Sequence, residues 1–301
     1  KKCFYCGKRF VKKNGLVKGV QLYKCAHCGK QFLGGQRINN EQIWEEYKSG
    51  KQTYLQLAHK YNCSVKTIQR RLDKIKIVAT EKTGRVVVVL MDTTYWGRGF
   101  GVMLFKDAYT KENLLKYYVK TETNGLYIEG IKELKRRGFT ISAIVCDGRK
   151  GLIASFKGIP VQMCQFHQAA IIRRYLTRKP KLKAAQELMD VVDLMKQTDK
   201  ESFVGALGLW LEKWKVFLNE RTVNPTTNKS FYTHKRLRSA YRSLKNNLPW
   251  LFTWHDNREL QIPNTTNAID GHFADLKNKL RNHNGLSMKR KMKFIDGFLK
   301  V

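Results

Sequence analysis

The sequence predicts an α/β protein in which a central sheet follows two small modules and is interrupted by a helical segment. Two apolar runs of strand length, residues 86–92 and 141–147, each end on an aspartate. Two CxxC pairs lie within the first 28 residues. The 301 residues carry a formal net charge of +34, from 58 Lys and Arg against 24 Asp and Glu. This excess of positive charge indicates a polyanionic partner.

Composition narrows the class of protein further. With 42% hydrophobic residues, the chain has enough apolar surface to build cores, so disorder throughout is not expected. No apolar run reaches the length of a membrane span, and no signal-peptide pattern is found, so we expect a cytoplasmic protein without a membrane partner. Seven cysteines fall into two close pairs and three scattered positions, a pattern typical of intracellular metal binding.

Residues 1–37 have the pattern of a zinc ribbon. Their two CxxC pairs are separated by 18 residues, within the range of a four-cysteine zinc site. A segment this short cannot form a stable hydrophobic core without a metal ion or disulfide to cross-link it. We therefore expect one structural Zn²⁺ and, because the ribbon is basic, contact with DNA. The expected ligands are Cys3, Cys6, Cys25 and Cys28.

Residues 38–80 predict a helix-turn-helix. One helix is expected from residue 40 to about residue 49, a second over 53–61, and a third over 65–74 with Ser64 as its N-cap. A short turn before the last helix is typical of this DNA-binding motif. A three-helix protein-interaction module is the alternative, which the basic charge of residues 1–80 disfavours. The residues expected to contact bases and phosphates are Lys66, Thr67, Gln69, Arg70 and Arg71.

Residues 84–177 predict three meandering strands, a helix and a fourth strand, which is the order of an RNase H-like catalytic core. In that fold the first and fourth strands lie side by side, so Asp92 and Asp147 would reach neighbouring strand ends. Two such carboxylates can hold two Mg²⁺ or Mn²⁺ ions. Either aspartate alone could be an ordinary turn residue, and Asp107 is expected to be one. The expected elements are strands at 85–94, 100–106, 114–120, 140–146 and 160–164 and a helix at 124–137.

The remaining segments predict a helical insertion at 178–261 and a final catalytic segment at 262–301. Insertion helices are expected at 181–196, 199–220 and 232–247. Of the paired tryptophans, Trp210 and Trp214 are expected in the core, whereas Trp250 and Trp254 flank Pro249 and are candidates for stacking on unpaired bases. Before the insertion, Cys164 and His167 are expected at the edge of the active site. The helix that begins at these residues carries Arg173 and Arg174, which are candidate DNA contacts.

The final segment predicts a helix over 264–280 with Asp270 about one turn from its start. Asp270 lies beside an apolar stripe, so it could complete the metal site; Asp275 is the alternative. A dense basic face follows and is expected to grip phosphates. Its expected DNA contacts are Lys277, Lys279 and Arg281, continued by Lys289, Arg290, Lys291 and Lys293.

With these motifs in place, the chain resembles bacterial insertion-sequence DDE transposases of the Mutator-like group, in a zinc-ribbon variant. The resemblance covers the whole sequence, and its specific parts are Cys164-Gln-Phe-His167 and Thr266-Asn-Ala-Ile-Asp270. It implies that Asp92, Asp147 and Asp270 are the catalytic acids. It also implies double-stranded DNA partners (transposon ends and target), no small-molecule substrate, a homodimer, and association with the bacterial nucleoid.

The resemblance implies a DNA transposase that binds terminal inverted repeats and performs metal-dependent strand cleavage and strand transfer. This chain departs from the family at position 270, where the family has Glu. Asp is one methylene shorter, which reduces its reach by roughly 1 Å. Two alternatives therefore stand beside the transposase: a catalytically inactive, transposase-derived DNA-binding regulator, and an RNase H-like nuclease without strand transfer.

Overall fold

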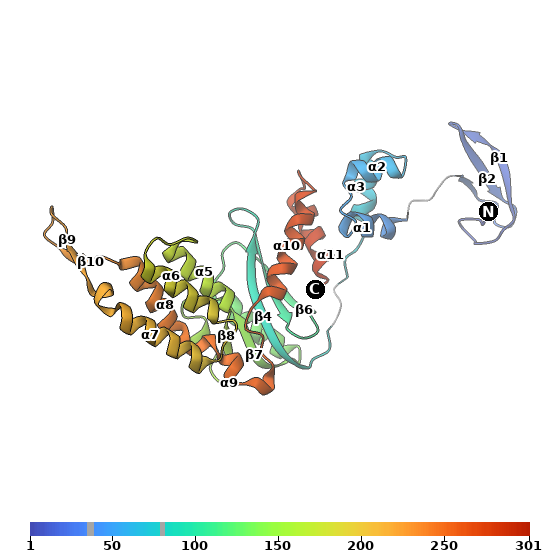
Figure 1. Cartoon of the computed structure of the whole chain (residues 1–301). Coiled ribbons are helices and arrows are strands. Elements are labelled where there is room, and N and C mark those ends of the chain that lie inside the picture. Colours follow the sequence, from blue (N-terminus) through green and yellow to red (C-terminus); the bar gives the residue numbers. More distant parts are fainter. Residues whose placement is uncertain (35–38, 79–81) are drawn as a thin grey trace. The chain divides into compact units, whose positions relative to one another are not determined.

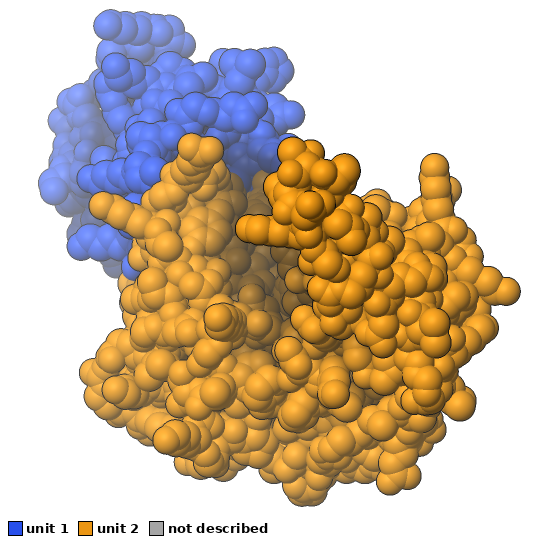
Figure 2. All heavy atoms as spheres, turned by 90° about the vertical axis from the view of Figure 1, so that its left-hand side faces the viewer, with its two compact units in different colours: residues 1–77, 278–298 blue, residues 78–277, 299–301 orange. Residues whose placement is uncertain are grey.

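The computed structural model describes residues 1–34, 39–78 and 82–301 (Figure 1). The chain divides into two compact units, which Figure 2 distinguishes by colour. The first comprises residues 1–77 and 278–298, and the second comprises residues 78–277 and 299–301. The expected final segment, 262–301, is therefore shared between the units. Within the described ranges, no helix is long and apolar enough to cross a membrane.

The first unit begins with a small antiparallel sheet in the order β1-β2-β3. Its strands are β1 (Val11–Val17), β2 (Val20–Cys25) and β3 (Gln31–Leu33). Their side chains are mostly exposed, apart from Cys25. A sheet with so little buried apolar surface needs another source of stability, as expected for a metal-stapled module.

The three helices predicted for residues 38–80 are confirmed. They are α1 (Asn40–Lys48), α2 (Tyr54–Lys60) and α3 (Val65–Lys74). Each begins at a polar residue whose side chain accepts backbone N–H groups of the first turn: Asn39, Thr53 and Ser64. Ile43, Leu57 and Ile68 are fully buried, one from each helix. These local signals explain why the sequence located the helices within a residue or two.

A fourth helix, α11 (Met288–Leu299), packs against α1 and α3. A Cβ atom on Gly297 would lie 2.2 Å from the Trp44 ring of α1, so only glycine allows this approach. Arg290 forms an ion pair with Asp73 at 2.8 Å, and Lys293 Nζ donates to the Leu72 and Asp73 carbonyl oxygens at the C-terminal end of α3. Arg290 and Lys293 were expected to grip phosphates. In the structure both side chains attach α11 to α3.

The second unit is built on a five-stranded mixed sheet in the order β6-β5-β4-β7-β8. The central strand β4 pairs antiparallel with β5 and parallel with β7. The predicted adjacency of the first and fourth strands is therefore confirmed. The elements are β4 (Val86–Tyr95), β5 (Gly101–Asp107), β6 (Asn113–Val119), α4 (Asn124–Arg136), β7 (Thr140–Cys146) and β8 (Val161–Met163), with a 3₁₀ turn η1 (Ile153–Ser155) between the last two strands.

Helices cover both faces of this sheet. On one face, α4 approaches so closely that a Cβ atom on Gly130 would lie 2.0 Å from the Phe105 ring. On the other face lies α10 (Asn267–Arg281), where the Lys106 ammonium is 3.2 Å from His272 Nδ1. Burial on both faces explains why β4 is a continuous apolar run rather than an alternating one.

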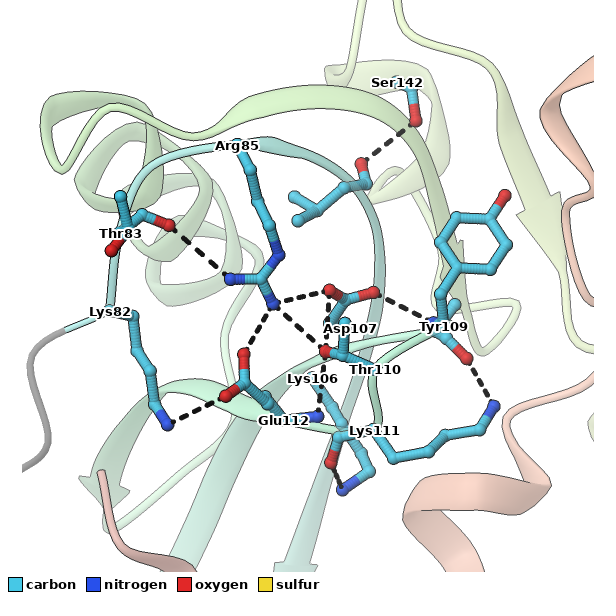
Figure 3. Close-up of polar contacts among 12 residues, drawn as sticks. Lys82, Thr83, Arg85, Lys106, Asp107, Tyr109, Thr110, Lys111, Glu112 and Ser142 are labelled. Carbon is cyan, nitrogen blue, oxygen red and sulfur yellow. Dashed lines mark hydrogen bonds and ion pairs between the residues drawn. The ribbon is translucent and has the colours of Figure 1, made fainter.

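A polar network joins the start of β4 to the β5–β6 hairpin (Figure 3). Arg85 reaches Asp107 at 2.8 Å and Glu112 at 2.6 Å. Asp107 also accepts the Tyr109 N–H at 2.9 Å, which confirms it as a turn former. Burial raises the pKa of Asp107, but the Tyr109 N–H and the Arg85 guanidinium more than offset this and hold it below its usual range. Asp107 is therefore a structural acid.

The predicted helical insertion consists of packed helices and a short hairpin that the sequence did not indicate. Trp210 is buried and donates to the Ala184 carbonyl oxygen at 2.9 Å, as expected of a core residue. Trp250 and Trp254, the candidates for base stacking, are half-buried and pack against the core of this unit. The elements are α5 (Gln165–Leu176), α6 (Lys183–Leu194), α7 (Lys200–Asn219), β9 (Arg221–Val223), β10 (Ser230–Tyr232), α8 (Lys235–Leu251), α9 (Thr253–Asp256) and η2 (Arg258–Leu260).

Candidate functional site

The two CxxC turns of the ribbon have the same backbone geometry. The Gly7 N–H donates to the Cys3 carbonyl oxygen at 3.0 Å, and the Gly29 N–H donates to the Cys25 carbonyl oxygen at 2.9 Å. Both glycines have positive φ, +74° and +71°. L side chains rarely adopt such a conformation. Each glycine therefore allows the tight turn that brings two thiols to one side.

The four cysteine sulfurs lie at the spacing of a tetrahedral site. Cys3 Sγ is 3.5 Å from Cys28 Sγ, and Cys6 Sγ is 3.7 Å from Cys25 Sγ. All four ligand atoms lie within 4.8 Å of one another. A Zn–S distance of about 2.3 Å implies tetrahedral S–S edges of about 3.8 Å, whereas a disulfide would bring sulfurs to about 2.05 Å. The cluster fits Zn²⁺.

A second cluster lies in the second unit and combines residues from three elements. Asp92 of β4, His167 of α5 and Asp270 of α10 each offer a ligand atom, and these atoms lie within 4.8 Å of one another. His167 was expected only at the edge of the site, but it lies among the acids. The Nδ1 atom of His167 is buried and has no hydrogen-bond partner among the described residues. The two converging carboxylates form a donor set that fits a divalent cation.

Asp147 approaches this cluster from the neighbouring strand. In the β4–β7 ladder Leu90 pairs with Val145, so the two aspartates each follow the last paired residue by two positions. Asp147 is half-buried and accepts the Arg149 N–H at 3.3 Å. Among the described residues, the metal-sized cluster contains Asp92, His167 and Asp270 but not Asp147. Its charge nevertheless acts on Asp92.

The electrostatics of the cluster favour positive charge between the acids. Burial, followed by repulsion from Asp270 and Asp147, raises the pKa of Asp92 to about 7. The influence of the neighbouring Cys164 thiol, followed by attraction to Asp92 and Asp270, raises the pKa of His167 to about 9. A cation placed here would relieve the repulsion that raises the pKa of Asp92.

Two segments about 100 residues apart are tied together beside the acids. The Thr266 N–H and hydroxyl each lie 3.3 Å from Cys164 Sγ, and the Gln165 N–H donates to the Asn264 carbonyl oxygen at 2.9 Å. The Thr266 hydroxyl also lies 3.1 Å from Asp270 Oδ2. Burial raises the pKa of Cys164, but hydrogen bonds from His167 and Thr266 outweigh it and lower that pKa.

From the sequence, Thr266 was named only as the start of the motif that ends at Asp270, with no role of its own at the site. Its position four residues before Asp270 could have indicated a contact between the two side chains, since residues four apart on a helix are neighbours. The buried thiol of Cys164 holds the start of α10, and thus Asp270, near the sheet.

The predicted DNA contacts differ in their surroundings. Lys66, Arg70, Arg174 and Arg281 are exposed. Arg71 is half-buried and donates to Asn40 at 3.1 Å. The other candidates, Thr67, Gln69, Arg173, Lys277 and Lys279, are half-buried.

Comparisons with known proteins give weak structural similarity. No protein-family model and no curated protein matches the chain. The chain is similar to the Drosophila P element transposase strand transfer complex, with 13% identity over 90% of this chain and 74% of that chain and a TM-score of 0.36. It is also similar to the simian T-cell lymphotropic virus intasome in complex with PP2A regulatory subunit B56 gamma, with 12% identity, 65% and 73% coverage and a TM-score of 0.22. At these scores neither similarity carries an argument about function.

Proposed function

We propose that this chain is a DNA transposase with an RNase H-like core, which binds terminal inverted repeats and performs metal-dependent cleavage and strand transfer. The observation that carries the proposal is the convergence of Asp92, on the central strand β4, with Asp270 and His167. Asp147, at the end of the neighbouring strand, supplies the third acid. The net charge of +34 supports a nucleic-acid substrate.

In this proposal Asp92 and Asp270 hold a divalent cation, with Asp147 beside them. The chemistry supplied by such bound cations is Lewis acidity at the phosphodiester and a nucleophile available at neutral pH. His167, whose pKa is raised to about 9, would present positive charge to a phosphate oxygen. The exposed basic side chains of Lys66 and Arg70 on α3 would contact the DNA phosphates.

The Asp at position 270 favours a second candidate, an inactive DNA-binding regulator. The geometry argues against this regulator, because the Asp270 carboxylate lies within 4.8 Å of the ligand atoms of Asp92 and His167 despite its shorter side chain. The Thr266 hydroxyl, 3.1 Å from that carboxylate, helps to orient it. We therefore favour an active enzyme.

The test is a cleavage assay on DNA first selected for binding from a random duplex library. The parent chain should cut selected DNA with Mg²⁺ or Mn²⁺. Asp92→Ala and Asp147→Ala should each lower the rate by at least about 10³-fold, because electrostatic stabilisation of the transition state is lost, while affinity for the DNA stays the same. Asp190→Ala, at an exposed position on α6, is the matched control.

Comparison of the parent with Asp270→Glu separates the candidates. An active parent that loses cleavage on Asp270→Ala supports Asp270 as the third acid. A silent parent that gains cleavage on Asp270→Glu identifies an inactivated relative. Joining of the released 3′ end to a second duplex separates a transposase from a nuclease. Binding without cleavage in any form would leave only the regulator.

A further inference from the structure

The helical part of the second unit contains a pocket that shares no residue with the Asp92 cluster. It has a volume of about 480 Å³ and lies where the end of α5 meets the starts of α6 and α8. Its apolar lining includes Tyr175, Leu176, Leu182 and Leu237. Tyr175 is 37% exposed and Leu182 is 46% exposed, so a ring and a leucine remain open to a ligand. The pocket is large enough for a small aromatic ligand.

The rim of the pocket is basic. Lys179, Lys181, Lys235 and Arg236 line it, and none of the lining residues that the structure describes is acidic. Two of these cations are held in place: Arg236 donates to the Arg174 carbonyl oxygen at 2.6 Å, and Lys235 lies 3.9 Å above the Phe231 ring. Lys179 and Lys181 are exposed. This arrangement complements an anion such as a phosphate.

Backbone groups add to this positive character. The residues that precede α6 and α8, Leu182 and His234, both line the pocket. Neither caps its helix through a side-chain hydrogen bond. The first N–H groups of a helix lack intrahelical partners, and the positive end of the helix dipole lies there. Two such ends beside four cationic side chains strengthen the preference for a phosphate.

We infer that this pocket binds an unpaired nucleotide of a DNA strand, with the base against Tyr175 and the flanking phosphates on Lys179 and Lys181. This inference rests on the proposed function, because it assumes a DNA substrate. A paired base exposes only its edge in a groove, whereas the pocket offers an aromatic side chain and room for a whole base. The exposed Arg178 and Lys183 continue the basic rim and fit a strand that extends beyond one nucleotide.

The test compares binding of a blunt duplex with that of the same duplex carrying a short single-stranded extension. The full, zinc-loaded chain is used without Mg²⁺ or Mn²⁺, so that cleavage does not enter the result. Tyr175→Ala should weaken binding of the extended DNA by about 5-fold or more and leave the blunt duplex unchanged, and Tyr175→Phe should restore it. Lys179→Ala combined with Lys181→Ala should lower the salt dependence of binding the extended DNA, reducing the slope by about 1.4. Lys132→Ala, at an exposed position on α4, is the control.

A photocrosslink adds a positional readout. Extended DNA with 5-iodouracil at a single unpaired position should crosslink to Tyr175 in the parent chain. The inference is overturned if Tyr175→Ala weakens both DNAs equally, if the crosslink forms outside the pocket, or if a free mononucleotide competes as well as the strand. Failure of cleavage with an intact preference for extended DNA would count against the proposed function alone.

Discussion

The acids of the candidate active site should make the cation-free protein less stable at high pH, and Asp92→Asn tests this. Burial and the neighbouring acids raise the pKa of Asp92 to about 7. An unfolded chain has an aspartate pKa of about 3.9, so the folded state binds the proton more tightly. Stability is therefore lost as pH rises from about 4 to 7, up to about 4 kcal/mol when Asp92 is fully ionised.

Asparagine has nearly the same shape and does not ionise. Asp92→Asn should therefore be more stable than the parent at pH 8, by up to about 4 kcal/mol, and close to it at pH 4. His167 adds a stabilisation that is present below about pH 6.5 and lost as pH rises through about 9. The main cause of that shift is the contact with Cys164, which the substitution keeps, so most of it cancels in the comparison.

Urea unfolding followed by tryptophan fluorescence measures the effect. Five of the six tryptophans lie in the second unit, and only Trp44 lies in the first, so the signal reports mainly the unit that holds Asp92. Asp190→Asn is the control for removal of an exposed carboxylate. A stability difference between Asp92→Asn and the parent that is the same at pH 5 and pH 8 would refute the reasoning. Adding Mg²⁺ at pH 8 should stabilise the parent more than Asp92→Asn, since only the parent has repulsion to relieve.

Three further predictions concern the first unit. Cys25→Ser should remove bound zinc and unfold the ribbon while the fluorescence transition of the second unit stays unchanged; stoichiometric zinc in that variant, by atomic emission, would contradict the site. Gly297→Val should destabilise the unit by about 1–3 kcal/mol in thermal unfolding, because its side chain would meet the α1 indole, whereas Gly205→Val, in a helix with open space, should lack this clash. Arg290→Ala should weaken DNA binding less than Arg70→Ala, since Arg290 pairs with an α3 carboxylate and Arg70 is exposed; equal losses in a titration would return Arg290 to the DNA surface.

Much of the fold could be predicted because its signals are local. The N-caps Asn39, Thr53 and Ser64 accept hydrogen bonds from residues two or three positions away, and the CxxC turns close within five residues. The apolar strands and their order were predicted in the same way, from runs of residues and the elements between them. Such features depend on neighbours in the chain, which the sequence displays directly.

Other features were decided by contacts between distant residues. Trp250 and Pro249 have the local character of an irregular segment, yet they lie in α8, and Trp250 packs on the core of the second unit. Arg290 lies in a basic run typical of a DNA surface, yet Asp73, 217 positions away, pairs with it. The charge and size of a side chain do not predict which distant residue it will contact, because that contact depends on how the whole chain packs.

For the candidate active site the division is similar. The sequence alone predicted that Asp92 and Asp147 belong to neighbouring strands and that the four ribbon cysteines form two matched turns. The packing of distant segments brings His167 close to Asp92 and Asp270, and it brings Cys164 to Thr266 at the start of α10. Strands and tight turns follow from local sequence patterns, whereas three side chains from three elements meet only when the sheet and both helices pack together.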